Sequence, residues 1–300
     1  MTGFLFAGQG SQYVGMGRDL YDAFPESKAI FDQACDILKL DFKKLLFEGP
    51  QESLKPTGIS QPAILTVSIA AFEAFKSRTD VTPCLAAGLS LGEYTALIAM
   101  GSLTFIDGLR LVQKRGQIMD LAAERHPGKM AAIIDLSLEK VKEACRLAGA
   151  EVANINSPGQ TVISGKKEAV EAAMDLSLKS GAKRALPLEV SGGFHSSLMQ
   201  EAAEELKVVL GSVPMSEPKV PVISNYTARR ERTVGEIREN LFFQMYSAVR
   251  WEESMKLMLS EGIGKFYEFG PGKVLKGLMR RIDTNAEVST IEKKEDILRL

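Results

Sequence analysis

The 300-residue sequence is 45% hydrophobic and 25% charged, with a formal net charge of −1, which suits a globular chain with a large buried core. This near-neutral charge provides no overall field to attract nucleic acid or a membrane surface. The N-terminus lacks a basic n-region and no run of about 18 uncharged apolar residues occurs, so we expect neither secretion nor membrane spanning. The cysteines Cys35, Cys84 and Cys145 are too few and too far apart for a disulfide framework or a zinc site, and they predict buried thiols in a cytoplasmic protein.

A short apolar run from Phe4 to Ala7 shows no alternation and predicts a strand that is buried on both faces. It ends in the glycine-rich stretch Gly8-Gln9-Gly10-Ser11-Gln12. This stretch lacks the lysine and the spacing of a phosphate-binding P-loop. We therefore expect the loop to supply a backbone N–H donor for an oxyanion.

Helices and strands alternate through the next hundred residues. Apolar residues recur at helical spacing over 19–46, with interruptions near Pro25 and Asp41. The elements that follow are predicted as a helix over 61–75, a strand over 84–87, a helix that ends at residue 100 and a helix over 105–123. This order predicts a parallel sheet covered by helices.

The stretch Gly88-Leu89-Ser90-Leu91-Gly92 lies between the strand over 84–87 and the helix after it. A strained strand-to-helix turn of this kind pushes the serine Oγ outward and needs glycine where a Cβ would collide. Ser90 is therefore the candidate nucleophile. The N–H of Leu91 begins the helix without an intrahelical acceptor, so it can bind an oxyanion at the positive end of the helix dipole. The alternative is a chance five-residue pattern, which only the context can exclude.

In residues 127–195 the predicted strands and helices follow a different order from those on either side. Their predicted elements are a strand over 130–136, a helix over 138–147, strands over 152–156 and 161–164, a helix over 167–180 and a strand over 185–190. This order is typical of a ferredoxin-like subdomain, which we predict to be inserted into an α/β core formed by residues 1–126 and 196–300. The core resumes with predicted helices over 197–210, 234–243, 252–261 and 274–281 and strands over 220–224 and 265–269.

A serine nucleophile needs a base, and the only histidines are His126 and His195. His126 lies in a polar junction that contains Pro127 and Gly128, where a solvated loop histidine is the ordinary interpretation. His195 lies where the chain returns to the core, so it can approach the elbow from the subdomain side. We take His195 as the candidate base; the alternative is a structural histidine with satisfied hydrogen bonds.

A basic stretch runs from Arg110 to Arg115. One interpretation is a solvated helix face. The other is a bidentate ion pair between the Arg115 guanidinium and a substrate carboxylate. A lysine ammonium cannot form this two-bond pair. No acidic third member of a triad stands out by position, so a backbone carbonyl or an amide such as Gln244 would orient the imidazole and make a dyad.

Six stretches, in the same order, resemble motifs of the malonyl-CoA:acyl-carrier-protein transacylases of type II fatty acid synthesis, and the match runs nearly end to end. They are Gly8 to Gln12, Gly88 to Tyr94, Lys114 to Gly116, Asn154 to Gly165, Gly193 to Ser196 and Phe269 to Gly272. Each motif alone is weak, but the ordered set is specific. The resemblance implies an α/β-hydrolase-like core with a mostly parallel sheet and an inserted ferredoxin-like subdomain.

The resemblance also implies a two-step acyl transfer. Ser90 would attack the malonyl thioester and His195 would take its proton, while the backbone N–H groups of Leu91 and Gln9 would hold the oxyanion. Coenzyme A would leave, and the phosphopantetheine thiol of acyl carrier protein would collect the malonyl group. No cofactor and no metal are implied, because malonyl-CoA is a substrate.

Four more positions match residues of the family's substrate site. By this resemblance Arg115 pairs with the malonyl carboxylate and Gln244 lies beside it. Asn154 and Asn156 would border the entrance of the phosphopantetheine arm. The chain departs from the family pattern at Leu89, where many relatives have histidine; this departure leaves the nucleophile, the base and the oxyanion donors in place.

Three other functions stay open on the sequence alone. An α/β-hydrolase esterase would use the same elbow but needs no arginine. A catalytically idle module that binds a carrier protein would have no need of the nucleophile, the base and the arginine together. An acyltransferase that serves a polyketide synthase in trans would share the mechanism.

Acyl carrier proteins are generally acidic, so we expect a local basic surface where the carrier protein docks. One candidate surface lies on the last predicted helix and the other at the edge of the subdomain. The residues concerned are Lys273, Lys276, Arg280 and Arg281 on the helix, and Lys183 and Arg184 at the edge.

Overall fold

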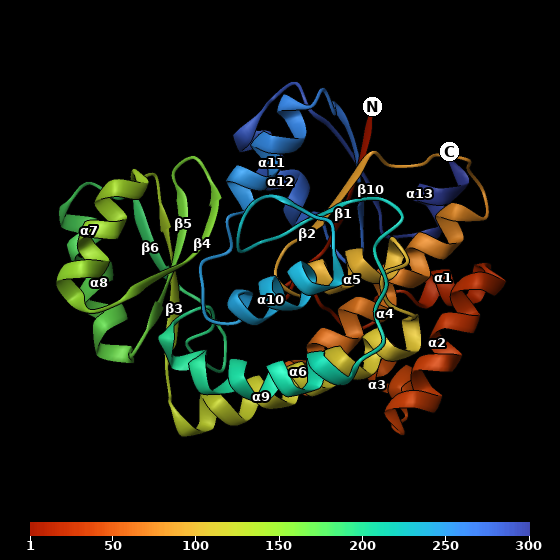
Figure 1. Ribbon diagram of the computed structural model, residues 1–300, viewed down its shortest axis with the longest axis horizontal. Helices are drawn as coiled ribbons and strands as arrows, with labels where there is room; N and C mark the ends of the chain where they lie inside the picture. Colours follow the sequence, from red (N-terminus) through yellow and green to blue (C-terminus); the bar gives the residue numbers. More distant parts are fainter.

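The computed structural model describes residues 1–300 as an α/β fold with two sheets (Figure 1). The larger sheet is parallel except for its last strand pair. Its strands are, in sheet order, β10 (Glu287–Ile291), β9 (Lys265–Phe269), β1 (Thr2–Phe6), β2 (Leu85–Gly88), β7 (Val222–Ile223) and β8 (Arg230–Glu231). The mostly parallel sheet predicted from the alternation of strands and helices is therefore confirmed.

Helices cover both faces of the larger sheet. On β1, Phe4 and Phe6 belong to the apolar cluster under α2, α4 and α6, whereas Leu5 between them packs with α11 and α12. Burial on both faces explains why this strand shows no alternation. The helices outside the smaller sheet are α1 (Arg18–Ala23), α2 (Pro25–Leu38), α3 (Phe42–Glu48), α4 (Thr57–Lys76), α5 (Leu91–Ala99), α6 (Phe105–Arg125), α9 (Gln200–Ser212), α10 (Val234–Gln244), α11 (Trp251–Ser260), α12 (Val274–Ile282) and α13 (Lys294–Leu298), with 3₁₀ turns at η1 (Gln51–Leu54) and η2 (Ser197–Met199).

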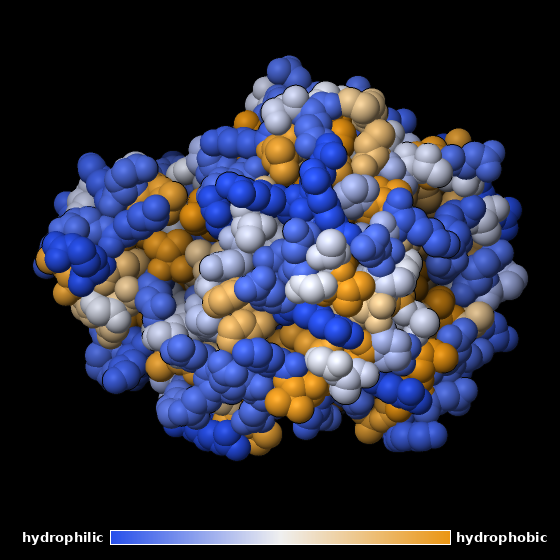
Figure 2. Space-filling view, in the orientation of Figure 1, coloured by the Kyte–Doolittle hydropathy of each residue, from blue (hydrophilic) through white to orange (hydrophobic).

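The smaller sheet is antiparallel and is formed entirely within residues 129–187. Its strands are, in sheet order, β4 (Glu151–Ser157), β5 (Gln160–Gly165), β3 (Lys129–Ile134) and β6 (Arg184–Pro187). Helices α7 (Leu138–Ala148) and α8 (Lys167–Lys179) bury their apolar side chains against it. This part of the chain forms the lobe at the left of Figures 1 and 2, and its outer surface is largely hydrophilic.

Strand β4 ties the smaller sheet to the rest of the molecule. The Ile155 N–H donates to the Val249 carbonyl at 2.9 Å, and the Val249 N–H donates to the Ala153 carbonyl at 2.8 Å. This edge strand is therefore covered by the main chain of the larger part instead of being left open. The two parts meet along β4, beside α11 and α12.

Helix α4 is the only helix long and apolar enough to cross a membrane, and 83% of its most apolar stretch is buried in the fold, so it is a core helix. It begins at Thr57 instead of at Gln61, the predicted start. The Asp120 carboxylate on α6 accepts hydrogen bonds from the N–H groups of Thr57 and Gly58 at 3.0 and 2.7 Å. These contacts satisfy two of the helix's free N–H groups, so a residue distant in sequence determines where the helix starts.

Two further predictions differ from the structure. Of the three cysteines predicted as buried thiols, Cys145 is buried, Cys35 is half-buried and Cys84 is exposed. Cys84 precedes β2 and therefore lies outside the covered part of the sheet. The elements β8, β10 and α13 were not predicted, because they have only 2, 5 and 5 residues, too few to show a periodicity.

Candidate active site

The turn between β2 and α5 has the geometry of a nucleophile elbow. Ser90 has φ 53° and ψ −101°, a strained conformation for a residue with a side chain. A Cβ on Gly88 would lie 1.9 Å from the backbone of Gly92, and one on Gly92 would lie 2.2 Å from the Phe6 carbonyl oxygen. Only glycine fits at both positions. The glycine spacing predicted from the sequence is therefore a packing requirement of this turn.

His195 lies beside the serine, although 105 residues separate them in the chain. The Ser90 Oγ and His195 Nε2 atoms are 2.8 Å apart, and His195 Nδ1 is 2.8 Å from the Gln244 carbonyl oxygen. A carbonyl can only accept, so Nδ1 carries the proton and Nε2 is free to accept the serine proton. Gln244 is the last residue of α10, where carbonyls have no intrahelical partner.

Arg115 lies on the other side of the serine and is fully buried. Its Nη2 donates to Ser90 Oγ at 3.3 Å and to Gln244 Oε1 at 3.1 Å, and its Nη1 donates to Gln61 Oε1 at 2.7 Å. The guanidinium also stacks over the Tyr94 ring, 5.0 Å from its centroid. The solvated-face interpretation is therefore wrong for this residue.

A close crossing of α4 and α6 brings the arginine to the serine. A Cβ on Gly116 would lie 2.7 Å from the Gly58 Cα, so the two helices touch backbone to backbone at this point. Arg115 directly precedes Gly116 on α6 and Gln61 lies about one turn after Gly58 on α4, and the two side chains are hydrogen-bonded at 2.7 Å. This contact gives the long arginine side chain a fixed direction.

Two backbone N–H groups next to the serine have no acceptor within the protein. Leu91 opens α5, and the Gln9 N–H belongs to the loop after β1; neither makes a backbone hydrogen bond. A Cβ on Gly8 would lie 2.4 Å from the Leu89 carbonyl oxygen, so glycine is required for this loop to approach the elbow. Both N–H groups are available to bind a developing oxyanion.

A cleft of about 500 Å³ leads to the serine from the junction of the two sheets. Ser90 and His195 lie in its wall together with Gln9 and Leu89. The predicted residues Asn154 and Asn156 on β4 line the same cleft and are mostly buried. Apolar side chains from both parts of the fold complete the wall; they are Met119, Met130, Val162, Leu188, Val190, Phe194, Val274 and Leu278.

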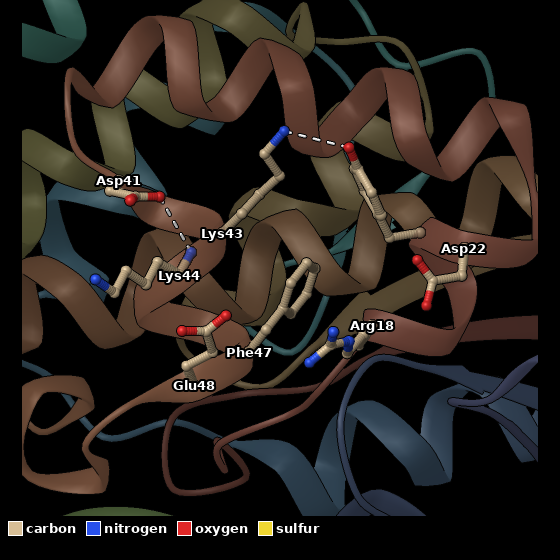
Figure 3. Close-up of a pocket in the computed structure, with 8 residues that line it drawn as sticks. Arg18, Asp22, Asp41, Lys43, Lys44, Phe47 and Glu48 are labelled. Atoms are coloured by element: carbon tan, nitrogen blue, oxygen red, sulfur yellow. Dashed lines mark hydrogen bonds between the residues drawn. The ribbon is translucent and has the colours of Figure 1, made fainter.

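A second hollow, of about 360 Å³, lies between α1 and α3 (Figure 3). Lys43 donates hydrogen bonds there to Tyr21 at 3.2 Å and to Asp32 at 2.7 Å. No nucleophile stands next to a base in it. The residues that line it are Arg18, Tyr21, Asp22, Asp41, Lys43, Lys44, Phe47 and Glu48.

Comparison with known proteins identifies the family. Residues 3–290 match the acyl transferase domain family. The chain is 46% identical to the malonyl CoA-acyl carrier protein transacylase of Bacillus subtilis, over 98% of this chain and 94% of that protein. It is 42% identical to the protein of the same name from Escherichia coli K12, over 93% of this chain and 92% of that one. The chain belongs to the malonyl-CoA:acyl-carrier-protein transacylase family.

Solved structures of the family share the fold over nearly the whole chain. An acyl carrier protein S-malonyltransferase from Vibrio cholerae superposes with a TM-score of 0.96 at 40% identity, covering 99% of each chain. A malonyl-transacylase in complex with a type II PKS acyl-carrier protein superposes with a TM-score of 0.97 at 40% identity, covering 99% of this chain and 97% of that one. The family resemblance noted from six motifs is confirmed.

Three residues that were not predicted complete the surroundings of the family's elbow serine. Gln61 binds the arginine; it is the only amide side chain in the mostly apolar helix α4, and that is the signal that marks it. Asn225 follows β7, at the carboxyl edge of the sheet where sites of α/β proteins form, and its Oδ1 accepts from the Ser90 N–H at 2.6 Å. Glu93 is fully buried and holds Asn225 and Gln244 through hydrogen bonds of 2.9 and 2.8 Å.

Proposed function

We propose that this protein transfers the malonyl group of malonyl-CoA to the phosphopantetheine thiol of acyl carrier protein, through a malonyl-serine intermediate. The family supports the reaction, and one observation supports the acid substrate: a buried arginine lies 3.3 Å from the candidate nucleophile. A site for uncharged acyl groups gains nothing from that charge. Ser90, His195 and Arg115 therefore receive the roles of nucleophile, base and carboxylate ligand.

In the first half-reaction, the Ser90 hydroxyl gives its proton to His195 Nε2 as Oγ bonds to the thioester carbon. The carbonyl oxygen becomes an oxyanion, which the N–H groups of Gln9 and Leu91 stabilise. Collapse of this intermediate breaks the carbon–sulfur bond. Coenzyme A leaves as the thiol after taking the proton from His195, and malonyl stays on the serine.

The second half-reaction repeats these steps with another thiol. The phosphopantetheine thiol gives its proton to His195, and its sulfur attacks the malonyl-serine ester. The bond between the acyl carbon and Ser90 Oγ then breaks, and the serine oxygen takes the proton back from His195. The Gln244 carbonyl holds the imidazole in one orientation through both steps, so the pair acts as a dyad oriented by a carbonyl. In this proposal only groups of this chain, the malonyl thioester and the acceptor thiol take part, and coenzyme A enters as part of a substrate.

Arg115 and Gln244 position the malonyl group. In the structure, Nη1 and Nη2 of Arg115 donate to the amide oxygens of Gln61 and Gln244. Small movements would let both nitrogens donate to the malonyl carboxylate instead. Asn154 and Asn156 are proposed to border the pantetheine arm, because they line the cleft that leads to the serine.

A carrier protein of polyketide synthesis is the second candidate acceptor. The structural neighbour in complex with a type II PKS acyl-carrier protein favours this alternative over the others. An esterase is disfavoured by the buried arginine, and an idle module by the distance of 2.8 Å between the serine and the histidine.

Intact-mass analysis after mixing with malonyl-CoA, with no acceptor present, tests the first half-reaction. We expect a gain of one malonyl group on the protein, mapped to Ser90 by peptide analysis. Addition of a carrier protein with its phosphopantetheine arm should remove the adduct. An unmodified protein would contradict the proposed function.

Arg115→Ala is expected to lower the malonyl-to-acetyl ratio of kcat/KM by about 10² to 10³, because an unpaired buried charge costs about 3 to 5 kcal/mol. Without the guanidinium, nothing replaces the water that the malonyl carboxylate loses on binding. The acetyl group has no carboxylate, so it loses no such interaction. Arg115→Lys is the matched variant; it keeps the charge but should rescue poorly, because lysine lacks the fork. If the ratio does not fall in Arg115→Ala, the arginine is not the carboxylate ligand.

The acid limb of kcat/KM is expected near pH 4. Burial, followed by the charge of Arg115, lowers the pKa of His195 from 6.5 to about 4. The neutral imidazole is the form that accepts the serine proton, so activity should persist at mildly acidic pH and fall only as the pH drops through the lowered pKa. A limb close to pH 6.5 would show a histidine with an ordinary pKa.

The carrier protein is proposed to dock where the two predicted basic surfaces meet. Arg281 on α12 and Lys183 at the subdomain edge both face Asp135, with nitrogen–oxygen distances of 3.8 and 3.9 Å. Arg281 shares a helix face with Val274 and Leu278, which line the cleft. The other helix candidates, Lys273, Lys276 and Arg280, project from the remaining faces.

Lys183→Glu or Arg281→Glu is expected to raise the KM for carrier protein, more strongly at low salt, and to leave slow hydrolysis of malonyl-CoA unchanged. Lys276→Glu, on another face of the same helix, is the matched control. Equal effects of all three substitutions, or equal effects on hydrolysis, would exclude this dock.

We further infer that the chain is organised as an α/β-hydrolase-like core of residues 1–126 and 196–300 with a ferredoxin-like subdomain at 127–195. The separate four-stranded sheet, with its order β4-β5-β3-β6 and two covering helices, supports this division.

A cytoplasmic location is proposed as well; the three free cysteines are consistent with it.

A further inference from the structure

A buried carboxyl that the steps above do not use lies directly behind Arg115. Glu93 Oε2 accepts hydrogen bonds from the Asn225 N–H at 2.9 Å and from Gln244 Nε2 at 2.8 Å. The same Gln244 amide accepts from Arg115 Nη2 through its Oε1 at 3.1 Å. One amide group therefore connects the carboxyl of Glu93 to the guanidinium of Arg115.

The direct partners of the guanidinium are all neutral. They are the amide oxygens of Gln61 and Gln244, the Ser90 hydroxyl and the Tyr94 ring. A buried cation without a counter-charge is strongly destabilising, and Glu93 is the carboxyl that reaches it through a hydrogen-bonded chain. Without substrate, the two charges balance through the amide. A malonyl carboxylate would bring a second negative charge to the same guanidinium.

We propose that Glu93 is the internal counter-ion of Arg115 and takes up one proton from solvent when the malonyl carboxylate binds. The inference rests on the proposed malonyl transfer. The buried cluster then has the same net charge with and without substrate. Glu93 Oε1 has no hydrogen-bond partner, so it can carry the proton while Oε2 keeps both of its hydrogen bonds. The network that positions Gln244 is therefore preserved when Glu93 becomes neutral.

Among the titratable groups around Glu93, the pKa of Glu93 itself lies near neutral pH. Burial raises the pKa of Glu93 to about 7, against the opposing hydrogen bonds and the charge of Arg115. Burial, followed by the nearby Glu93 charge, raises the pKa of Glu231 on β8 well above its ordinary value, so Glu231 is the second buried carboxyl to be tested beside Glu93. Burial raises the pKa of Tyr94 to about 12, and burial lowers that of His195 to about 4, so both are neutral.

The sign of the pH dependence follows from proton uptake. Above the pKa of Glu93 the free enzyme holds the carboxylate, so malonyl binding requires a proton and weakens as the pH rises, by up to about tenfold per pH unit. Below that pKa the proton is already present and the dependence vanishes. Acetyl-CoA has no acyl carboxylate and should show no such dependence.

Calorimetry on the Ser90→Ala protein, which cannot form the adduct, measures the proton directly. Malonyl-CoA is titrated above the pKa of Glu93 in two buffers of different ionisation enthalpy, with coenzyme A as the reference ligand. The expected result is an uptake approaching about one proton with malonyl-CoA relative to coenzyme A. Adding Glu93→Gln should abolish the uptake, because glutamine keeps an oxygen acceptor but cannot titrate.

Glu231→Gln is the matched control, because it removes the other buried carboxyl beside the same cluster and leaves Glu93 in place. The uptake should persist in it. The proposal is overturned if malonyl-CoA and coenzyme A take up the same number of protons. It is also overturned if the uptake survives Glu93→Gln or is lost only in Glu231→Gln.

Should Glu93→Gln fail to fold, the wild-type enzyme still decides the question. A malonyl-to-acetyl ratio of 1/KM that stays constant from about pH 6 to about pH 9 would overturn the proposal. Failure of the malonyl transfer itself would be seen separately, as the absence of a malonyl adduct on Ser90.

Discussion

Ser90→Ala is expected to abolish the malonyl adduct while the protein keeps its fold. The lost Oγ is the only atom placed to attack the thioester, and its removal takes away two hydrogen-bond contacts, to His195 and Arg115. Arg115 keeps its bonds to Gln61 and Gln244, so the site should hold its shape. Intact mass reports the adduct, and thermal unfolding reports the fold.

Ser11→Ala is a suitable control, because this serine lies in the loop beside the elbow and its hydroxyl donates only to the Gly8 carbonyl, at 2.9 Å. It should form the adduct as the wild type does. Malonylation that persists in Ser90→Ala would reveal a different nucleophile.

His195→Ala is expected to lower the rate of malonyl transfer by about 10² to 10⁴, the usual effect of removing a general base. Without the imidazole, the serine proton has no acceptor within hydrogen-bond distance. The Gln244 carbonyl loses its donor as well, but α10 and the Glu93 contact still hold Gln244. Single-turnover formation of the adduct measures the chemical step apart from product release.

His126→Ala tests the assignment with the only other histidine. Its ring is exposed and lies 3.4 Å from the Glu201 carboxylate, outside the cleft. Its loss should leave the rate nearly unchanged. If it slowed the enzyme more than His195→Ala does, the choice of base would be reversed.

Local sequence patterns were enough to predict the elbow. The spacing of Gly88 and Gly92 around the serine is the known pattern of such a turn, and the Gly88 requirement is local to it, because a Cβ there would meet the Gly92 backbone; the collision at Gly92 is with Phe6 on β1. The base was predictable for a different reason, because the chain has only two histidines and one of them lies in a polar junction. The strand and helix order of residues 127–195 was predictable from the sequence, because α7 and α8 bury one face each and β3 is a short apolar run that is buried on both faces.

The sequence also indicated, in part, that the Arg115 side chain points into the protein. Its buried neighbours on α6 include Leu111, Val112 and Met119, which share its helix face at intervals of three to four residues. Its position on this apolar face of α6 therefore argued against a solvated side chain. The apolar face does not specify which residues the guanidinium contacts inside the protein.

Only the tertiary structure decided the network around the serine. Gln61, Asn225 and Gln244 come from three different elements, and they meet because α4 crosses α6 backbone to backbone and because β7 lies next to β2. Glu93, which holds two of them, looks in the sequence like an ordinary helix-starting glutamate. The sequence by itself determined which residues carry reactive groups and where the chain turns. Their hydrogen-bond partners lie in segments distant in the sequence, 54 residues away for Arg115 and Gln61 and 135 for Ser90 and Asn225. No local pattern exists for such contacts, because burial and hydrogen bonding are properties of the packed molecule.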